Sequence, residues 1–116
     1  MNRISVLVKK TPKLNNSFIY HYIDYQKELT YAAKEFPGFI KTESYTINEL
    51  FDENNVNYDN VKKIINISTW TNVDFWNNWY YSNKRNEIKK KYDNTIKSEE
   101  ITILKNKNYF DDTFLL

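Results

Sequence analysis

The chain has 116 residues, of which 41% are hydrophobic and 17% aromatic, so we expect one domain spanning residues 1–116, with its core in 3–105. Seventeen basic residues nearly balance 15 acidic ones, and this balance excludes strong electrostatic attraction to nucleic acid. The absence of cysteine excludes disulfides and thiolate chemistry and fits a reducing cytoplasm. No apolar run approaches the roughly 20 residues that cross a bilayer, so we expect a soluble, cytoplasmic protein without membrane contact.

The first predicted element is a strand at residues 3–10, which ends before Pro12 because proline cannot continue a central strand. A helix follows, and Asn15, Asn16 or Ser17 can cap its start. Apolar residues recur along it at helical spacing, at Phe18, Ile19, Tyr22, Ile23, Leu29, Ala33 and Phe36. The helix is expected to end at Pro37-Gly38, where the only glycine of the chain can adopt a positive φ.

Two strands are predicted next, at residues 39–47 and 61–70, joined by an acidic, Asn-rich hairpin loop at 48–60. Alternation puts the side chains of Phe39, Lys41, Glu43 and Tyr45 on one face of the first strand. In the second strand, Ile64, Asn66, Ser68 and Trp70 share one face, and Ile65, Ile67 and Thr69 share the other.

An aromatic-rich helix is predicted after Trp70, with Thr71 or Asn72 as its cap. Phe75, Trp76 and Trp79 should point inward, and the helix should break or bend near Tyr81-Ser82 before it continues through "NKRNEIKKKY". A last strand, "EEITILK", covers residues 99–105. The order β-α-β-β-α-β predicts an α+β, ferredoxin-like sandwich, in which two helices cover one face of a four-stranded antiparallel sheet.

The other face of this sheet is predicted to carry apolar and aromatic side chains that no segment of the chain covers. A second copy that packs sheet to sheet would bury this face, because a two-fold axis lets one patch cover itself. We therefore expect a homodimer in the form of a dimeric α+β barrel. The tail at 106–116, which contains "YFDDTFLL", is a candidate for docking on the partner subunit.

Three motifs carry a family resemblance: "PGF" at 37–39, "ISTW" at 67–70 and "W-x-x-W-x-x-S-x-x-R" at 76–85. Over residues 3–105 the chain resembles the antibiotic biosynthesis monooxygenase superfamily, which includes quinol monooxygenases and haem-degrading enzymes. In the haem-degrading relatives a tryptophan nine positions after the strand-end tryptophan distorts the haem, and Trp79 stands nine positions after Trp70. Their axial histidine, however, corresponds to Lys89, and the asparagine of their first strand has no counterpart.

Cofactor-independent members bind a flat phenol or quinol between helices and sheet, so the resemblance implies such a substrate, no cofactor and no metal. The residues it implies for catalysis are Asn66, Trp79 and Arg85, and those for substrate binding are Trp70, Trp76, Tyr80 and His21. Each has a structural alternative: the tryptophans can be core, His21 can be a surface histidine, and Arg85 can pair with Glu87 or Asp74.

Three function classes remain open from the sequence. The first is a cofactor-independent monooxygenase, and the second is a non-catalytic dimeric module for binding or assembly, in which the aromatic side chains fill the cleft. The third, RNA recognition through the same element order, requires a glycine-containing signature in the third strand, and "IINISTW" lacks it.

Overall fold

The computed structural model describes residues 3–13, 19–48 and 61–105. Its elements are β1 (Ile4–Pro12), α1 (Ile19–Ala33), β2 (Phe39–Asn48), β3 (Val61–Trp70), α2 (Val73–Tyr80), α3 (Asn83–Tyr92), the 3-10 turn η3 (Asp93–Thr95) and β4 (Ile96–Lys105). The predicted helix caps at 15–17, most of the hairpin loop and the C-terminal tail lie outside the described residues. In the described ranges, no helix combines the length and apolarity needed to span a bilayer.

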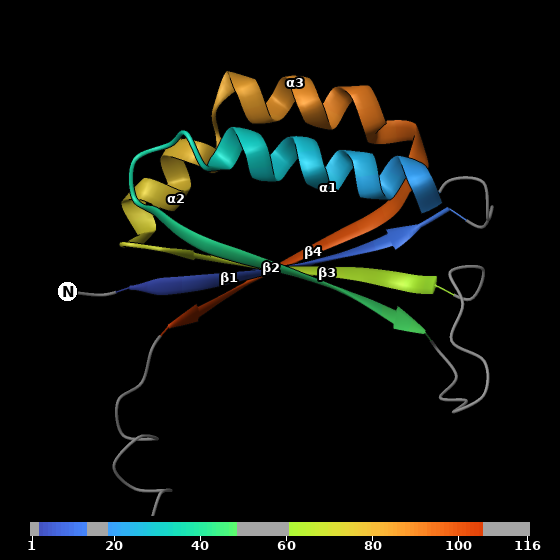
Figure 1. Cartoon of the computed structure of the whole chain (residues 1–116), viewed down its shortest axis with the longest axis horizontal. Helices are drawn as coiled ribbons and strands as arrows, with labels where there is room; N and C mark the ends of the chain where they lie inside the picture. The colour runs from blue at the N-terminus through green and yellow to red at the C-terminus, as the bar shows by residue number, and fades with distance from the viewer. Residues whose placement is uncertain (1–2, 14–18, 49–60, 106–116) are drawn as a thin grey trace, which may run out of the picture.

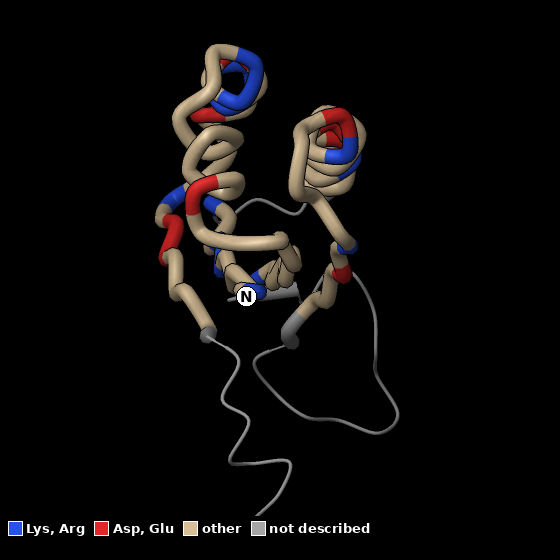
Figure 2. Tube along the Cα trace, turned by 90° about the vertical axis from the view of Figure 1, so that its left-hand side faces the viewer, with Lys and Arg blue, Asp and Glu red and all other residues tan. Residues whose placement is uncertain are grey.

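The four strands form one antiparallel sheet in the order β2-β3-β1-β4. All three helices lie on the same side of it, as Figure 1 shows. In the perpendicular view of Figure 2 the opposite side of the sheet is not covered by any of them. The predicted α+β, ferredoxin-like fold class is therefore confirmed, with the second helix divided into two.

The division of the second helix follows from its caps. Asn72 begins α2 by accepting a hydrogen bond from the backbone N–H of Phe75 at 3.1 Å. Ser82 then begins α3, since its Oγ accepts from the N–H of Arg85 at 3.1 Å while donating to the carbonyl of Trp79 at 2.7 Å. The break or bend predicted near Tyr81-Ser82 is confirmed as a break, since α2 ends at Tyr80 and α3 begins at Asn83.

The hydrophobic core lies between the helices and the sheet, and its fully buried side chains are Val6, Tyr22, Tyr25 and Trp70. The helical pattern in the sequence correctly placed Tyr22, but it did not single out Tyr25. The Tyr25 ring stacks on Tyr92 of α3, with 5.0 Å between ring centroids. This contact ties the two long helices together above β1.

The sequence predicted the wrong face of the sheet for Phe39, the first residue of β2, because it grouped Phe39 with Lys41 and Glu43. The register shifts between Phe39 and Lys41, so that Phe39 pairs with Trp70 and Lys41 with Thr69. This bulge turns Phe39 to the helix side, where its ring meets Trp70 edge to face at 5.4 Å. Gly38, immediately before the bulge, has φ +86°, as expected for a glycine at this turn.

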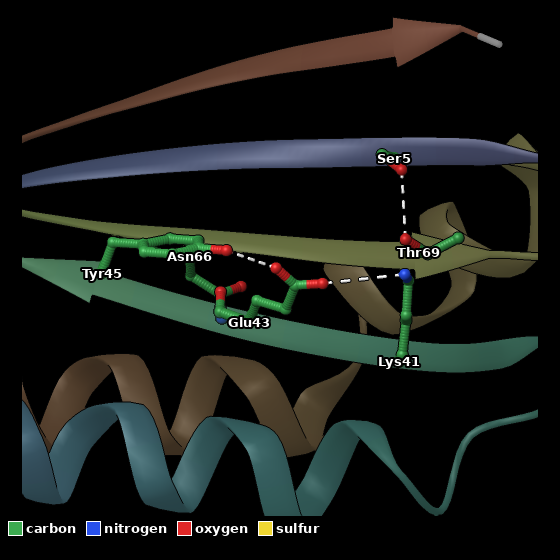
Figure 3. A network of polar contacts seen from close by, with 6 residues as sticks. All are labelled: Ser5, Lys41, Glu43, Tyr45, Asn66 and Thr69. Atoms are coloured by element: carbon green, nitrogen blue, oxygen red, sulfur yellow. Dashed lines mark hydrogen bonds and ion pairs between the residues drawn. The ribbon is translucent and has the colours of Figure 1, made fainter.

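The open face of the sheet carries a polar stripe beside an apolar one. Glu43 lies between Lys41, at 3.6 Å, and Tyr45, whose hydroxyl donates to it, and Ser5 meets Thr69 across β1 and β3 at 3.1 Å (Figure 3). The neighbouring apolar residues on this face are Leu7, Ile65, Ile67 and Leu104. Leu104 is 42% exposed, so this face keeps apolar surface that the described residues leave open.

Candidate functional site

The structure brings six of the seven predicted site residues to one small cavity between the helices and the sheet. These residues are Asn66, Trp70, Trp76, Trp79, Tyr80 and Arg85. The cavity has a volume of about 40 Å³, which suits water molecules rather than a fused ring system. His21 is exposed on α1 and does not line this cavity, so we leave it out of the candidate site.

Aromatic side chains make up much of the cavity wall. Trp79 meets the Phe36 ring edge to face at 5.1 Å, and Trp76 stacks on Tyr80 at 4.8 Å. Trp70 is fully buried, and its indole N–H donates to the Ser68 hydroxyl at 3.0 Å. Every indole ring is thus held by a neighbour, which gives the cavity rigid, flat walls.

Arg85 forms the main ion pair of the site. Its Nη2 lies 3.0 Å from Oε1 of Glu99 on β4, and both side chains are largely buried. Neither Glu87 nor Asp74, the partners considered from the sequence, is the one found, because residues two apart on a helix do not face each other and Asp74 is exposed. The guanidinium also lies over the Tyr80 ring, 4.2 Å from its centroid.

Lys10 of β1 is a cavity residue that the sequence reasoning missed. Its side chain is only 4% exposed, its Nζ donates to Oε1 of Gln26 at 3.2 Å, and it lies 4.8 Å from the centroid of the Tyr25 ring. Burial lowers the pKa of Lys10 to about 8, and the carboxylate of Glu99 opposes part of this change. The signal was present in the sequence, since alternation places Lys10 on the same face as Val6 and Val8.

Tyr25 adds a second buried polar group near Lys10. Within the part of the chain that the structure describes, its hydroxyl has no hydrogen-bond partner. Burial raises the pKa of this phenol well above its usual value. A buried hydroxyl in this state can donate to a water molecule or a ligand atom that comes within reach.

Asn66 projects from β3 toward β2 on the helix side of the sheet. Its Nδ2 donates to the Thr42 hydroxyl at 2.7 Å, to the Ser44 hydroxyl at 3.2 Å and to the Glu43 carbonyl at 3.3 Å. The amide is therefore fixed in orientation by β2. Its carbonyl oxygen is the atom suited to accept a hydrogen bond from a ligand hydroxyl.

A larger groove of about 480 Å³ lies beside this cavity, between α1 and the edge formed by β2 and β3. Its walls include Tyr22, Tyr31 and Ile64, and sequence reasoning did not identify it. Gln26 and Thr30 line both spaces. The groove is large enough for a ring system, and only these two side chains of α1 belong to both cavities.

Haem does not fit the residues present. Lys89, at the position of the axial histidine in the haem-degrading enzymes named above, is half-buried on α3, and a lysine side chain is not the imidazole ligand that their haem iron uses. The only histidine, His21, is exposed on another helix. The cavity beside Trp79, at about 40 Å³, is far smaller than a tetrapyrrole.

No family model matches the sequence, and no curated protein matches it. Solved structures do. SnoaB, a cofactor-independent oxygenase from Streptomyces nogalater, is 11% identical with a TM-score of 0.70, over 92% of this chain and 95% of SnoaB. A conserved protein from Methanosarcina mazei Go1 is 18% identical with a TM-score of 0.71, over 92% of this chain and 95% of that one.

A third similar structure is a protein from Lactobacillus acidophilus NCFM, which has been assigned as a monooxygenase by inference. It is 18% identical with a TM-score of 0.69, and the match covers 89% of this chain and 44% of that one. At these identities the likeness concerns the backbone arrangement. These matches show that the chain has the same α+β fold as SnoaB and the other two structures.

Proposed function

We propose that the protein is a cofactor-independent monooxygenase that oxidises a flat phenol or quinol bound between the helices and the sheet. The observation that carries this proposal is the charge of the inner cavity. Lys10 and Arg85 both line it, and none of its described lining residues is acidic. Arg85 is paired with Glu99, so Lys10 supplies most of the positive charge that can stabilise an anion in this buried site, and the reacting form of a phenol or quinol is its anion.

Lys10 is the group suited to produce that anion. With a pKa of about 8, its amine exchanges a proton close to neutral pH, as a general base must. It takes the proton of a substrate hydroxyl that reaches into the inner cavity, and the resulting ammonium and Arg85 then stabilise the phenolate. Asn66, held by β2, accepts a hydrogen bond from a hydroxyl that enters the cavity, Trp70 and Trp79 form the cavity walls, and the ring itself stays outside this small space.

Dioxygen is the oxidant in this proposal, and the substrate anion supplies the electrons. One oxygen atom of O2 becomes a carbonyl oxygen of the product. The other leaves as water with two hydrogen atoms from the substrate, so that the atoms and electrons balance. The likeness in fold to SnoaB, a cofactor-independent oxygenase, supports this reaction class.

A non-catalytic binding or assembly module is the second candidate, and tight packing favours it. Trp76 and Trp79 are 7% and 6% exposed, and the cavity between them and the sheet is about 40 Å³. In this case the aromatic residues serve as core. Oxygen uptake with a quinol decides between the two candidates.

Trp79→Ala and Asn66→Ala are each expected to lower oxygen uptake at least about a hundredfold, since one removes a wall and the other the group that orients the substrate. The assay follows oxygen consumption with 1,4-naphthohydroquinone and subtracts the uncatalysed rate. Trp79→Phe keeps an aromatic wall and should retain part of the activity. Asn78→Ala, an exposed asparagine of α2, is the control. Full activity in both alanine variants would sink the site assignment.

We also propose that two copies pair through the open sheet face, because Leu7, Ile65 and Ile67 otherwise face water. The wild-type protein should sediment as a dimer. Ile67→Lys places a charge at the centre of this face and should give a folded monomer by sedimentation velocity and circular dichroism. Val73→Lys, at a 39% exposed position on α2, should remain dimeric. A monomeric wild-type protein contradicts the proposal.

A further inference from the structure

We propose that the groove between α1 and the β2–β3 edge binds an aromatic ligand that carries an anionic group, such as an aromatic carboxylate. The inference rests on the proposed function only for the fate of the ligand, since binding can be measured without any reaction. The volumes of the two spaces also favour the groove as the place where the ring binds. The inner cavity of about 40 Å³ cannot hold a ring system, whereas the groove of about 480 Å³ can.

The charge of the groove selects an anion. Lys27 and Lys34 line it, and none of its described lining residues is acidic. Lys27 is on α1, and Lys34 follows its last residue, with its N–H still donating to the Thr30 carbonyl at 3.1 Å. Residues seven apart in this helical geometry project from the same side, about 10 Å from each other along the axis. A ligand lying along α1 therefore meets two positive charges in the groove.

The walls of the groove select an aromatic body. Ile23 and Ile64 supply aliphatic surface, and Tyr22 and Tyr31 supply rings. Tyr22 is buried and fixed, because its hydroxyl accepts from the backbone N–H of Lys13 at 3.2 Å. Tyr31 is 68% exposed. An exposed ring next to aliphatic surface is costly to leave in water and favours a flat partner.

Hydroxyl groups along one side give the groove polar contacts that fix orientation. Ser44 and Thr46 of β2 face Thr30 of α1 across it. Thr30 and Gln26 also line the inner cavity, and Gln26 is the residue that accepts the hydrogen bond from Lys10. A ligand seated in the groove can thus extend a hydroxyl toward the Lys10 amine past Gln26, while its anionic group stays with the lysines.

The test compares 2-naphthoate with 2-naphthamide, which has nearly the same shape but no charge, by isothermal titration calorimetry. Neither probe is a quinol, so no reaction is needed. The wild-type protein should bind the carboxylate about tenfold more tightly than the amide. The double variant Lys27→Gln/Lys34→Gln should lose this tenfold preference and bind the amide as before. Lys90→Gln/Lys97→Gln, at exposed positions on α3 and β4, is the matched control and should keep it.

Thr46→Trp places a large ring in the groove from β2 and should lower the affinity for both probes at least about tenfold, with an unchanged circular dichroism spectrum. Equal affinities of the wild-type protein for the two probes would overturn the inference, as would undiminished binding in Thr46→Trp. Oxygen uptake with neutral 1,4-naphthohydroquinone is measured in parallel. Uptake without naphthoate binding refutes the anion site alone, and naphthoate binding without uptake of oxygen refutes the oxygenase alone.

Discussion

Lys10→Met is expected to reduce oxygen uptake by two to four orders of magnitude while making the folded protein more stable. Methionine has a similar length and keeps the apolar part of the contact with Tyr25, but it can neither accept the substrate proton nor stabilise the anion. A general base contributes about 10²- to 10⁴-fold to a rate. Loss of activity together with a gain of stability is what a buried functional charge predicts, and a merely structural lysine would not give it.

The sign of the stability change follows from the pKa. The pKa of Lys10 falls from 10.5 to about 8 on folding, so the folded state releases its proton first as the pH rises. Below pH 8 both states carry the charge, and burial then costs the folded state about 3 kcal/mol. This cost disappears between pH 8 and 10.5. Because the contacts with Gln26 and Tyr25 offset part of it, we expect Lys10→Met to add roughly 1–3 kcal/mol to the free energy of unfolding at pH 7.

Urea denaturation at pH 7 and at pH 9.5 measures this effect. The free energy of unfolding of the wild-type protein should rise between these values, and that of Lys10→Met should not. The range stops short of pH 10 because burial raises the pKa of Tyr22 and Tyr25, and phenols that ionise only in the unfolded chain lower stability there. Lys97→Met, at an exposed position on β4, is the control. Wild-type activity in Lys10→Met would exclude it as the base, and parallel pH profiles would exclude a buried charge.

The sequence predicted the fold because local signals agreed along the chain. The alternation in β3, the stop at Pro37-Gly38 and the capping by Asn72 each have a local cause, and together they leave few ways to arrange four strands and the helices. The face of Phe39 was predicted incorrectly because a bulge is set by how β2 pairs with β3. Local alternation in one strand does not contain that information.

The site was harder to predict because its interactions cross between elements. The partner of Arg85 is Glu99, and finding it requires the position of α3 relative to β4. The same holds for the contact of Lys10 with Gln26. The volume left between Trp79 and the sheet depends on how several large rings pack, so a pattern of tryptophans identifies a wall without giving the size of the space behind it.

Gly38→Ala is expected to destabilise the protein by about 3–5 kcal/mol, for two separable reasons. The first is the backbone, since φ is +86° and an L-residue in this region costs roughly 1–2 kcal/mol. The second is space. A Cβ at this position would lie 2.3 Å from Cγ and 2.4 Å from Cβ of Phe75, and the Cβ of a helical residue cannot move without moving α2.

A double-mutant cycle with Phe75→Ala separates the two terms. In the Phe75→Ala background the clash is absent, so Gly38→Ala should cost only the backbone part, roughly 1–2 kcal/mol, in urea denaturation. Equal costs in both backgrounds would show that α2 does not press on this turn.

The contact between Gly38 and α2 matters for the site because the Gly38 carbonyl accepts from the N–H of Thr71 at 2.8 Å, just before α2 begins. The turn before β2 therefore fixes the start of the helix that carries Trp76 and Trp79, and a variant that shifts it should alter the inner cavity before it unfolds the sheet.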